Sequence, residues 1–306
     1  MEIESHPFGC SIIIASYNRS GLLDETLRSL ANHLRQSPGG KGVEVIVVDN
    51  NSSDDTAAVA ERHSSSFERY RVVKELKQGL SHARNAGVAA AGGDVIVFLD
   101  DDVELGEGWL AKLLEPFEAL SVGAAGGRVL PFGEKALPDW LPREYGYLVS
   151  VFDPSDVRCE VDKVMGANFA VRASFFTQVG GFDPALGRQG RKLMGGEEVE
   201  LFLRVTRAGL KIVYEPGAIV YHKIGEKLNR DYVVDYAYWL GASEALLDRK
   251  LHGAFKYCLK LFRSALFPVS VYPVMSWFAS GETEKLRQAI KTRYAKGYWA
   301  QAMGWH

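Results

Sequence analysis

Three clusters of polar residues lie in the first third of the sequence. They are Ser16-Tyr17-Asn18-Arg19, the run from Asp49 to Asp54, and Asp100-Asp101-Asp102. Each cluster directly follows a short apolar or β-branched run, which is typical of a buried strand. Because ligands of open parallel α/β sheets bind at the carboxyl ends of the strands, we expect the three clusters to meet at one edge of a sheet.

The aspartate triplet has the composition of a cation site. Asp100, Asp101 and Asp102 would repel one another at neutral pH unless a positive charge lay between them. Carboxylate oxygens suit a hard divalent cation, and Mg²⁺ or Mn²⁺ bound in this way commonly also takes phosphate oxygens of a substrate. The alternative is a solvated acidic loop that caps the next helix.

Four residues elsewhere in the chain could complete such a site. Glu197 and Glu198 follow two glycines at the start of a predicted helix, where one could act as a general base or both could simply favour the helix dipole. His222 ends a predicted strand, and a lone histidine there is more often structural; as a ligand it would favour Mn²⁺. Arg84 could balance diphosphate charge or pair with a surface acid.

Two common nucleotide-binding motifs are missing. The first loop has no Gly-x-Gly-x-x-Gly, which a dinucleotide fold uses to bring its backbone close to a pyrophosphate. The sequence also contains no Walker A motif. A dinucleotide-dependent dehydrogenase and a P-loop NTPase are therefore disfavoured.

The secondary-structure pattern predicts an α/β protein. Apolar runs alternate with stretches of helical spacing over the first hundred residues, which indicates a parallel sheet covered on both faces. The predicted strands are Cys10–Ala15, Val43–Val48, Tyr70–Lys74, Val95–Leu99, Lys211–Glu215 and Ala218–Tyr221. Later helices are predicted at Leu105–Leu120, Asn168–Val179 and Glu197–Ala208, and the chain reads as helical from Asp231 to its end.

The ordered set of motifs resembles the family-2 glycosyltransferases with the GT-A fold. The resemblance covers residues 10–224. Its motifs, in chain order, are Ser16-Tyr17-Asn18-Arg19, Asp49 in VVDNNSSDDT, Ala83-Arg84-Asn85-Ala86-Gly87, Asp100-x-Asp102, Gly166-Ala167-Asn168, Gly180-Gly181-Phe182-Asp183, Gly196-Glu197-Glu198 and Val220-Tyr221-His222.

The resemblance implies a metal-dependent, inverting hexosyltransferase. Such an enzyme moves a sugar from a nucleotide diphosphate sugar, most commonly a UDP-sugar, to an acceptor hydroxyl in glycan, polysaccharide or glycolipid synthesis. It implies Asp100, Asp102 and His222 as ligands of Mn²⁺ or Mg²⁺. It implies Glu198 as the base, with Glu197 as the alternative because the family's usual Glu-Asp is Glu-Glu here. The implied donor-binding residues are Ser16, Tyr17, Asn18, Arg19, Asp49, Asn51, Arg84, Asp100, Asp101, Gly166, Ala167 and Asn168.

The expected architecture has two parts. Residues 1–225 would form the GT-A catalytic domain, with a mixed, mostly parallel central sheet between helices. Residues 226–306 would form a C-terminal helical region that serves as an acceptor or membrane-surface element.

Composition agrees with a globular protein. The chain has 306 residues, is 47% hydrophobic and 24% charged, and carries a formal net charge of −2. These values exclude a disordered chain, a collagen-like repeat and a polytopic membrane protein. Three widely spaced cysteines, Cys10, Cys159 and Cys258, give neither a disulfide framework nor a zinc site. They favour a reducing cytosol, and the first eight residues lack the features of a signal peptide.

The near-neutral total charge hides a gradient. Residues 249–296 contain ten Lys and Arg and two acids, a balance of 10 − 2 = +8, so the rest of the chain carries −2 − 8 = −10. Basic residues with apolar residues at helical spacing predict either an interfacial element on an anionic membrane, over residues 249–298, or a solvated basic face. The apolar stretch Ala265–Ala279 is too short and proline-broken for a transmembrane helix. We expect a cytoplasmic protein, peripheral on the inner face of the membrane if the first reading holds, and no nucleic-acid partner.

Two other functions remain open at this stage. A haloacid-dehalogenase-like phosphatase also ends a strand with Asp-x-Asp, but its motif needs Thr or Val where this chain has Glu104, and its nucleophilic strand usually comes first. A sugar-nucleotide-binding protein without catalysis is disfavoured by the presence of Asp102, Glu198 and His222.

Overall fold

The computed structural model describes residues 9–37, 40–133, 137–190, 192–251 and 281–304. The chain forms two compact units. The sheet unit comprises Met1–Lys135, Ser150–Pro184 and Glu198–Lys223, and the helical unit comprises Ala136–Val149, Ala185–Glu197 and Ile224–His306.

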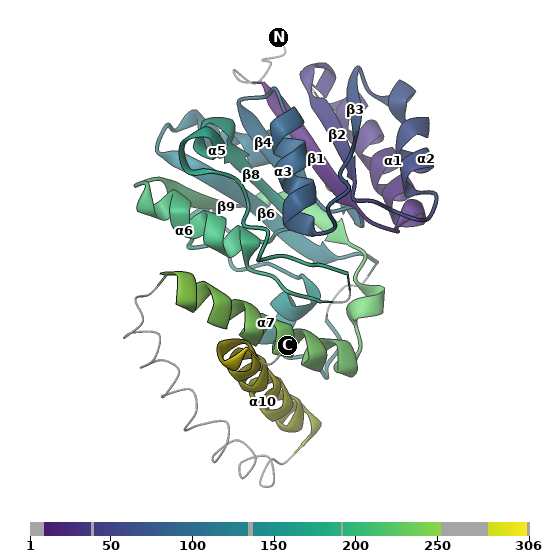
Figure 1. Ribbon diagram of the computed structural model, residues 1–306. Coiled ribbons are helices and arrows are strands. Elements are labelled where there is room, and N and C mark those ends of the chain that lie inside the picture. Colours follow the sequence, from purple (N-terminus) through teal and green to yellow (C-terminus); the bar gives the residue numbers. More distant parts are fainter. Residues whose placement is uncertain (1–8, 38–39, 134–136, 191, 252–280, 305–306) are drawn as a thin grey trace. The chain divides into compact units, whose positions relative to one another are not determined.

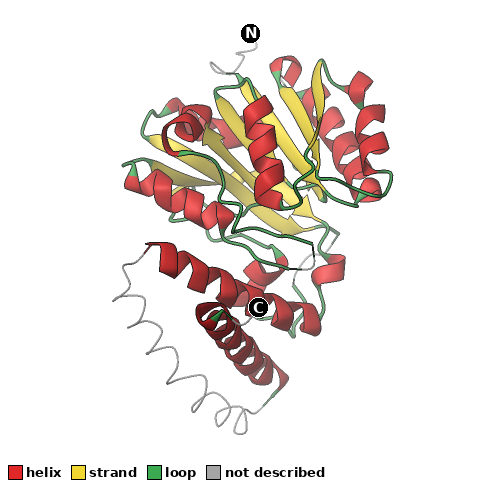
Figure 2. Ribbon diagram, in the orientation of Figure 1, coloured by secondary structure: helices red, strands yellow, loops and turns green. Residues whose placement is uncertain are grey.

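One mixed sheet organises the sheet unit (Figure 2). Its strand order is β3-β2-β1-β4-β8-β6-β9-β5, with β7 beside β9. Among the described strands, β1, β2, β3, β4, β6 and β9 run in one direction and β5, β7 and β8 run in the other. The bounds are β1 Cys10–Ser16, β2 Glu44–Asp49, β3 Arg69–Lys74, β4 Val95–Leu99, β5 Val103–Leu105, β6 Val122–Pro131, β7 Cys159–Glu160, β8 Asn168–Arg172 and β9 Lys211–His222. The predicted mixed, mostly parallel sheet is thus confirmed.

Helices bury both faces of this sheet. In β1, Ile12 and Ile14 pack in one apolar cluster with Leu23 and Leu27 of α1. Ile13 points to the opposite face and packs in a second cluster, where α3 lies across the strands (Figure 1). Because β1 is covered on both sides, its sequence is apolar from Ile12 to Ala15 and does not alternate. The helices of this unit are α1 Ser20–Gln36, α2 Thr56–Arg62, α3 Leu80–Ala90, α4 Trp109–Leu114, α5 Ala173–Val179 and α6 Glu197–Arg207, the last beginning one residue before the unit boundary.

One predicted helix is wrong in its first half. Residues 168–172 form strand β8, and only Ala173–Val179 is helical. β8 lies antiparallel between β4 and β6, with Asn168 opposite Leu99. Its apolar core is too short for periodicity to separate a strand from a helix, so long-range pairing decides its conformation.

Two further boundaries differ from the prediction. The two strands predicted on either side of Pro216-Gly217 form the single strand β9, and a register shift between Gly127 and Val129 of neighbouring β6 accommodates the irregularity. The helix predicted from Leu105 to Leu120 is shorter. Its first residue ends β5, α4 covers Trp109–Leu114, and a 3₁₀ turn at Glu115–Glu118 contains Pro116 near its start.

The helical unit is built around two long helices, α7 Arg230–Leu251 and α10 Glu282–Met303. They cross with their backbones in contact. A Cβ atom on Gly241 would lie 1.9 Å from the carbonyl oxygen of Tyr294, and one on Gly297 would lie 1.8 Å from that of Tyr238. Both positions therefore require glycine for this crossing.

The basic residues of α10 pair with acids of the same unit. Arg293 contacts Asp235 at 2.5 Å, and Arg287 contacts Glu144 at 2.7 Å. Lys291 and Lys296 are exposed. Lys256, Lys260, Arg263, Cys258 and the aromatic stretch Leu266–Phe278 lie outside the described residues. Within the described ranges, no helix is both long and apolar enough to cross a membrane.

Candidate functional site

The register of the parallel strands brings the three polar clusters together. Ser16 of β1 is the register partner of Asp49 at the end of β2, and Ile14 of β1 is that of Leu99 at the end of β4. The chain therefore leaves these three strands at the same edge of the sheet. Side-chain bonds join the resulting loops: the Ser16 hydroxyl donates to Asp101 Oδ2 at 2.5 Å, and the backbone N–H of Ser53 donates to Asn18 Oδ1 at 2.7 Å.

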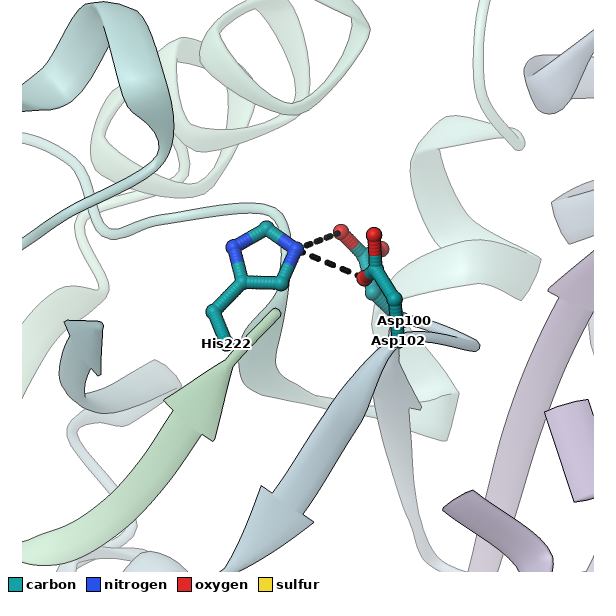
Figure 3. Close-up of side chains that lie close together, drawn as sticks. All are labelled: Asp100, Asp102 and His222. Carbon is teal, nitrogen blue, oxygen red and sulfur yellow. Dashed lines mark hydrogen bonds and ion pairs between the residues drawn. The ribbon is translucent and has the colours of Figure 1, made fainter. Parts of the chain in front are cut away.

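Asp100, Asp102 and His222 converge at this edge (Figure 3). His222 Nε2 lies 2.6 Å from Asp102 Oδ1 and 3.9 Å from Asp100 Oδ2. Strand pairing produces this arrangement, because β5 begins directly after Asp102 and runs antiparallel to β9, with Val103 opposite His222. Asp102 and His222 are 1% and 0% exposed, whereas Asp100 is half-buried.

The donor atoms of this cluster fit a divalent cation. One atom from each of the three residues lies within 4.8 Å of the other two. Ligands at about 2.1 Å from one octahedral ion lie roughly 3 to 4 Å apart, so small side-chain adjustments would suffice. Two carboxylates with one imidazole suit Mn²⁺ in particular, since nitrogen is a borderline ligand for Mg²⁺.

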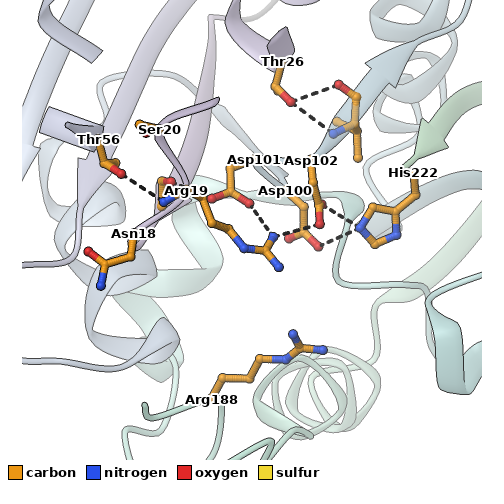
Figure 4. Close-up of polar contacts among 12 residues, drawn as sticks. Asn18, Arg19, Ser20, Thr26, Thr56, Asp100, Asp101, Asp102, Arg188 and His222 are labelled. Atoms are coloured by element: carbon orange, nitrogen blue, oxygen red, sulfur yellow. Dashed lines mark hydrogen bonds and ion pairs between the residues drawn. The ribbon is translucent and has the colours of Figure 1, made fainter. Parts of the chain in front are cut away.

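Arg19 bridges two of the aspartates (Figure 4). Its Nη1 donates to Asp101 Oδ1 at 3.0 Å and to Asp102 Oδ2 at 2.8 Å. Burial, together with the neighbouring Asp102 and Asp100, raises the pKa of Asp101 to about 6, although Arg19 and Ser16 oppose this shift. The carboxyl group of Asp101, which we expect to contact the donor, accepts bonds from Ser16 and Arg19 in this structure.

One carboxylate oxygen of Asp49 has no hydrogen-bond partner among the described residues. Its side chain is 1% exposed, and Oδ1 accepts a bond from the backbone N–H of Ser52 at 3.1 Å. Oδ2 is buried and has no hydrogen-bond partner among the described residues. A buried unpaired acceptor costs about 1–3 kcal/mol, so this atom is suited to a ligand N–H. Tyr17, in the loop after β1, and Asn51, in the loop after β2, are both exposed, and Asn51 has a φ of 61°.

Arg84 and Glu198 both lie close to Gly166. Arg84 is 4% exposed, donates to the carbonyl of Gly166 at 2.9 Å and lies 3.8 Å from Asp100 Oδ1. A Cβ atom on Gly166 would lie 3.1 Å from Glu198 Oε1 and 3.2 Å from Arg84 Nη2. The carboxylate of Glu198 is therefore next to the arginine that accompanies the aspartate cluster. Its Oε2 is buried without a hydrogen-bond partner in the described parts of the chain.

The remaining predicted residues have contacts within the fold. The carbonyl of Ala167 accepts a bond from the backbone N–H of Asp100. Asn168 is fully buried, donates to the carbonyl of Ala218 at 2.8 Å and accepts from Trp109 Nε1 at 2.8 Å. Glu197 is 3% exposed at the first position of α6 and belongs to the helical unit.

Two contributors were not predicted from the sequence. Asn50 donates to the carbonyls of Glu75 and Lys77 and accepts from the N–H of Gly79, so it holds the loop before α3. Thr56 accepts from the backbone N–H of Arg19. The Asp-Asn-Asn sequence is a recognised turn signal, but its distant partners cannot be read from local sequence.

Comparison with known proteins identifies the chain. Residues 11–177, more than half of the sequence, match the model of the family described as glycosyl transferase family 2. The chain belongs to glycosyl transferase family 2. It is therefore a glycosyltransferase, as the order of its motifs predicted.

Relatives of this glycosyltransferase extend the comparison. It is 24% identical over 245 residues to a glucosyl-dolichyl phosphate glucuronosyltransferase of Haloferax volcanii, covering 78% of this chain and 77% of that protein. It is 32% identical over 256 residues to a pre-mycofactocin glycosyltransferase of Mycobacterium tuberculosis, covering 80% of this chain but only 48% of that protein. The chain thus spans about half the length of the mycobacterial relative.

A solved structure shares the fold. A mannosyltransferase from Pyrobaculum calidifontis, in complex with GDP-Man and Mn²⁺, aligns with a TM-score of 0.66 at 17% identity, over 98% of this chain and 88% of that one. This likeness confirms the GT-A fold class with its C-terminal helical part.

Proposed function

We propose that this glycosyltransferase moves a sugar from a nucleotide diphosphate sugar to an acceptor hydroxyl, with inversion at the anomeric carbon and with the help of a divalent cation. One observation carries the proposal: the carboxylate of Glu198 lies beside Arg84 and Gly166, and Arg84 in turn lies 3.8 Å from Asp100 of the aspartate–histidine cluster. A base and a cation site at one sheet edge are the parts that this reaction needs.

In the proposed mechanism, Glu198 accepts the proton of the acceptor hydroxyl. The acceptor oxygen forms the new bond to the anomeric carbon while the bond to the diphosphate oxygen breaks, and its electron pair leaves with the diphosphate. A divalent cation held by Asp100, Asp102 and His222 would supply positive charge that stabilises this leaving group. Inversion follows because the chemistry is a single displacement without a covalent intermediate.

Two features support Glu198 over Glu197 as the base. Glu198 Oε1 lies close to Gly166 and to Arg84, which in turn is 3.8 Å from Asp100 of the aspartate–histidine cluster. Glu197 is almost completely buried. A base must reach its proton within hydrogen-bond distance, which disfavours a carboxylate enclosed by protein.

Asp49 is proposed to hold the nucleobase through its unpartnered Oδ2. This acceptor would select a base with an N–H donor in reach, such as uracil or guanine. Uracil is the proposed base. Because the Pyrobaculum mannosyltransferase is in complex with GDP-Man, GDP-sugars are tested as well.

The acceptor is proposed to be a hydroxyl on a glycan or on a lipid-linked sugar. The name of the Haloferax relative includes a dolichyl phosphate glycolipid, which supports the lipid-linked class. In this proposal residues 1–225 carry donor binding and catalysis, and residues 226–306 contact the acceptor or an anionic membrane surface.

A panel of nucleotide sugars tests this function. UDP-, GDP- and dTDP-sugars are incubated with the protein and Mn²⁺, and hydrolysis and thermal stabilisation are measured with and without EDTA. We expect one donor to be hydrolysed slowly and to raise the melting temperature only when Mn²⁺ is present. Equal hydrolysis in EDTA would contradict the cation role, and no response to any donor would contradict the proposed donor class.

A further inference from the structure

Arg19 connects the loop after β1 to the aspartate cluster through its side chain. The single atom Nη1 lies 3.0 Å from Asp101 Oδ1 and 2.8 Å from Asp102 Oδ2. The Arg19 side chain is one-third exposed, so it lies at the border between the buried carboxylates and solvent. It remains protonated at any relevant pH.

The backbone of this arginine is fixed by the loop after β2. Its N–H donates to Thr56 Oγ1 at 3.0 Å, and the next N–H, that of Ser20, donates to Asp54 Oδ2 at 3.1 Å. Asn18 adopts a φ of 52°, and its side-chain oxygen accepts from the N–H of Ser53. The backbone of Arg19 is thus held by the loop after β2, which begins at Asp49, the residue proposed to bind the nucleobase.

The contacts of Asp102 divide its two oxygens between two partners. Oδ2 accepts from Arg19, and Oδ1 faces His222. A divalent cation on Oδ1 would consequently lie within a few ångströms of a full positive charge. Like charges at that separation in a partly buried site repel by far more than they do in water, so the protein's own cation opposes binding of the metal.

The charges around the aspartate cluster suggest what the repulsion between Arg19 and a divalent cation would achieve. Asp100, Asp101 and Asp102 contribute three negative charges, and Arg19 with Arg84 offsets two of them. A nucleoside diphosphate adds negative charge at the same edge and would restore attraction for a divalent ion. Without Arg19, the aspartates alone would attract the ion.

We propose that Arg19 is a built-in counter-ion of the aspartate cluster, which makes the protein bind its divalent cation together with a nucleoside diphosphate instead of from solution alone. The inference rests on the proposed function, since it assumes that the cluster and the diphosphate share one cation. It assigns Arg19 a positioning and regulatory role that needs no contact with the transferred sugar.

Mn²⁺ titrations of the full chain test the proposal without any measurement of turnover. Free Mn²⁺ is followed by its electron paramagnetic resonance signal, with protein alone, with UDP and with GDP. The variants are Arg19→Gln, which removes the charge, and Arg19→Lys, which keeps it. Arg28→Gln is the matched control, because this arginine is on α1 with its side chain 70% exposed and pairs with Asp24.

The wild-type protein should bind Mn²⁺ at least about tenfold more tightly with one of the nucleotides than without, given charge interactions of this range in a partly buried site. Arg19→Gln should bind Mn²⁺ alone about tenfold more tightly than the wild type, and its nucleotide effect should shrink correspondingly. Arg19→Lys and Arg28→Gln should match the wild type.

Three results would overturn the proposal, and they separate it from the proposed function. If Arg19→Gln is folded and binds Mn²⁺ no more tightly than the wild type, the role of Arg19 is wrong while the cation site stands. If wild-type Mn²⁺ affinity is the same with and without nucleotide, the coupling is wrong, whether or not the variant folds. If Mn²⁺ does not bind under any condition, both this proposal and the cation role in the proposed function are wrong.

Discussion

Gly166→Ala is predicted to displace Glu198, the proposed catalytic base, without unfolding the protein. Gly166 is not among the glycines with positive φ, so alanine can adopt its backbone conformation. The added Cβ would lie 3.1 Å from Glu198 Oε1 and 3.2 Å from Arg84 Nη2. Both distances are tighter than ordinary contacts, and the two side chains would have to move by a few tenths of an ångström.

The expected cost can be worked out from this displacement. A misplacement of about 1 Å costs roughly a hundredfold in rate, and a general base contributes about 10²–10⁴-fold in all. A shift of a few tenths of an ångström should therefore lower kcat about tenfold, which is about 1.4 kcal/mol in the barrier. The KM for the donor should rise as well, because Gly166 and the displaced Arg84 are both among the residues expected to bind the donor.

Steady-state kinetics with the identified donor, together with thermal unfolding, measure both effects. Gly21→Ala is the matched control: a Cβ at this position of α1 meets no atom within 4 Å, so activity should be unchanged. Its stability should rise by up to about 1 kcal/mol, since alanine is the better helix former. A Gly166→Ala variant with wild-type kcat would refute the placement of the base beside Gly166.

Three further predictions concern other parts of the chain. Asp49→Asn should raise the Kd of the donor nucleotide at least about tenfold, as measured by calorimetry. Its melting temperature should be no lower than that of the wild type, since the substitution removes a buried unpaired charge. Unchanged affinity would contradict nucleobase binding by Asp49. Gly297→Ala should destabilise the protein by about 1–3 kcal/mol in urea unfolding, because its Cβ would overlap the backbone of α7. Gly225→Ala is the control, because a Cβ there meets no atom within 4 Å. Equal stabilities of the two variants would argue against the close helix crossing. Exchange of both Lys291 and Lys296 for Glu should abolish cosedimentation with anionic vesicles at low salt, and retained binding would exclude this face of α10.

The convergence of the site could be predicted from the sequence because it depends on a general rule. Each polar cluster follows a buried strand, and parallel strands expose their carboxyl ends at one edge. The alignment of Ser16 with Asp49 and of Ile14 with Leu99 then brings the loops together. The family was recognisable from the same residues, since their order along the chain is as specific as their types.

The errors arose where pairing between distant segments determines structure. The run from Asn168 to Arg172 is too short for its own pattern to separate a strand from a helix, and its pairing between β4 and β6 decides the outcome. In the same way, the hydrogen bond between Arg19 and Asp101 joins residues that are 82 positions apart in the chain. No local pattern shows either relation.

The net charge of +8 over residues 249–296 also leaves out contacts between distant parts of the chain. It compared cations with acids that are near in sequence, whereas Arg287 and Arg293 pair with Glu144 and Asp235, far away in the chain. The basic residues of α10 are therefore less available to a membrane than their number indicated.

Single-turnover kinetics of Glu198→Gln test the central claim most directly. The variant keeps the shape of the side chain but cannot accept the acceptor's proton. With the donor found in the nucleotide-sugar panel, we predict that the rate of transfer falls by at least about a hundredfold, while Mn²⁺ and nucleotide bind as in the wild type. Transfer at the wild-type rate would contradict the assignment of Glu198 as the base and the mechanism built on it.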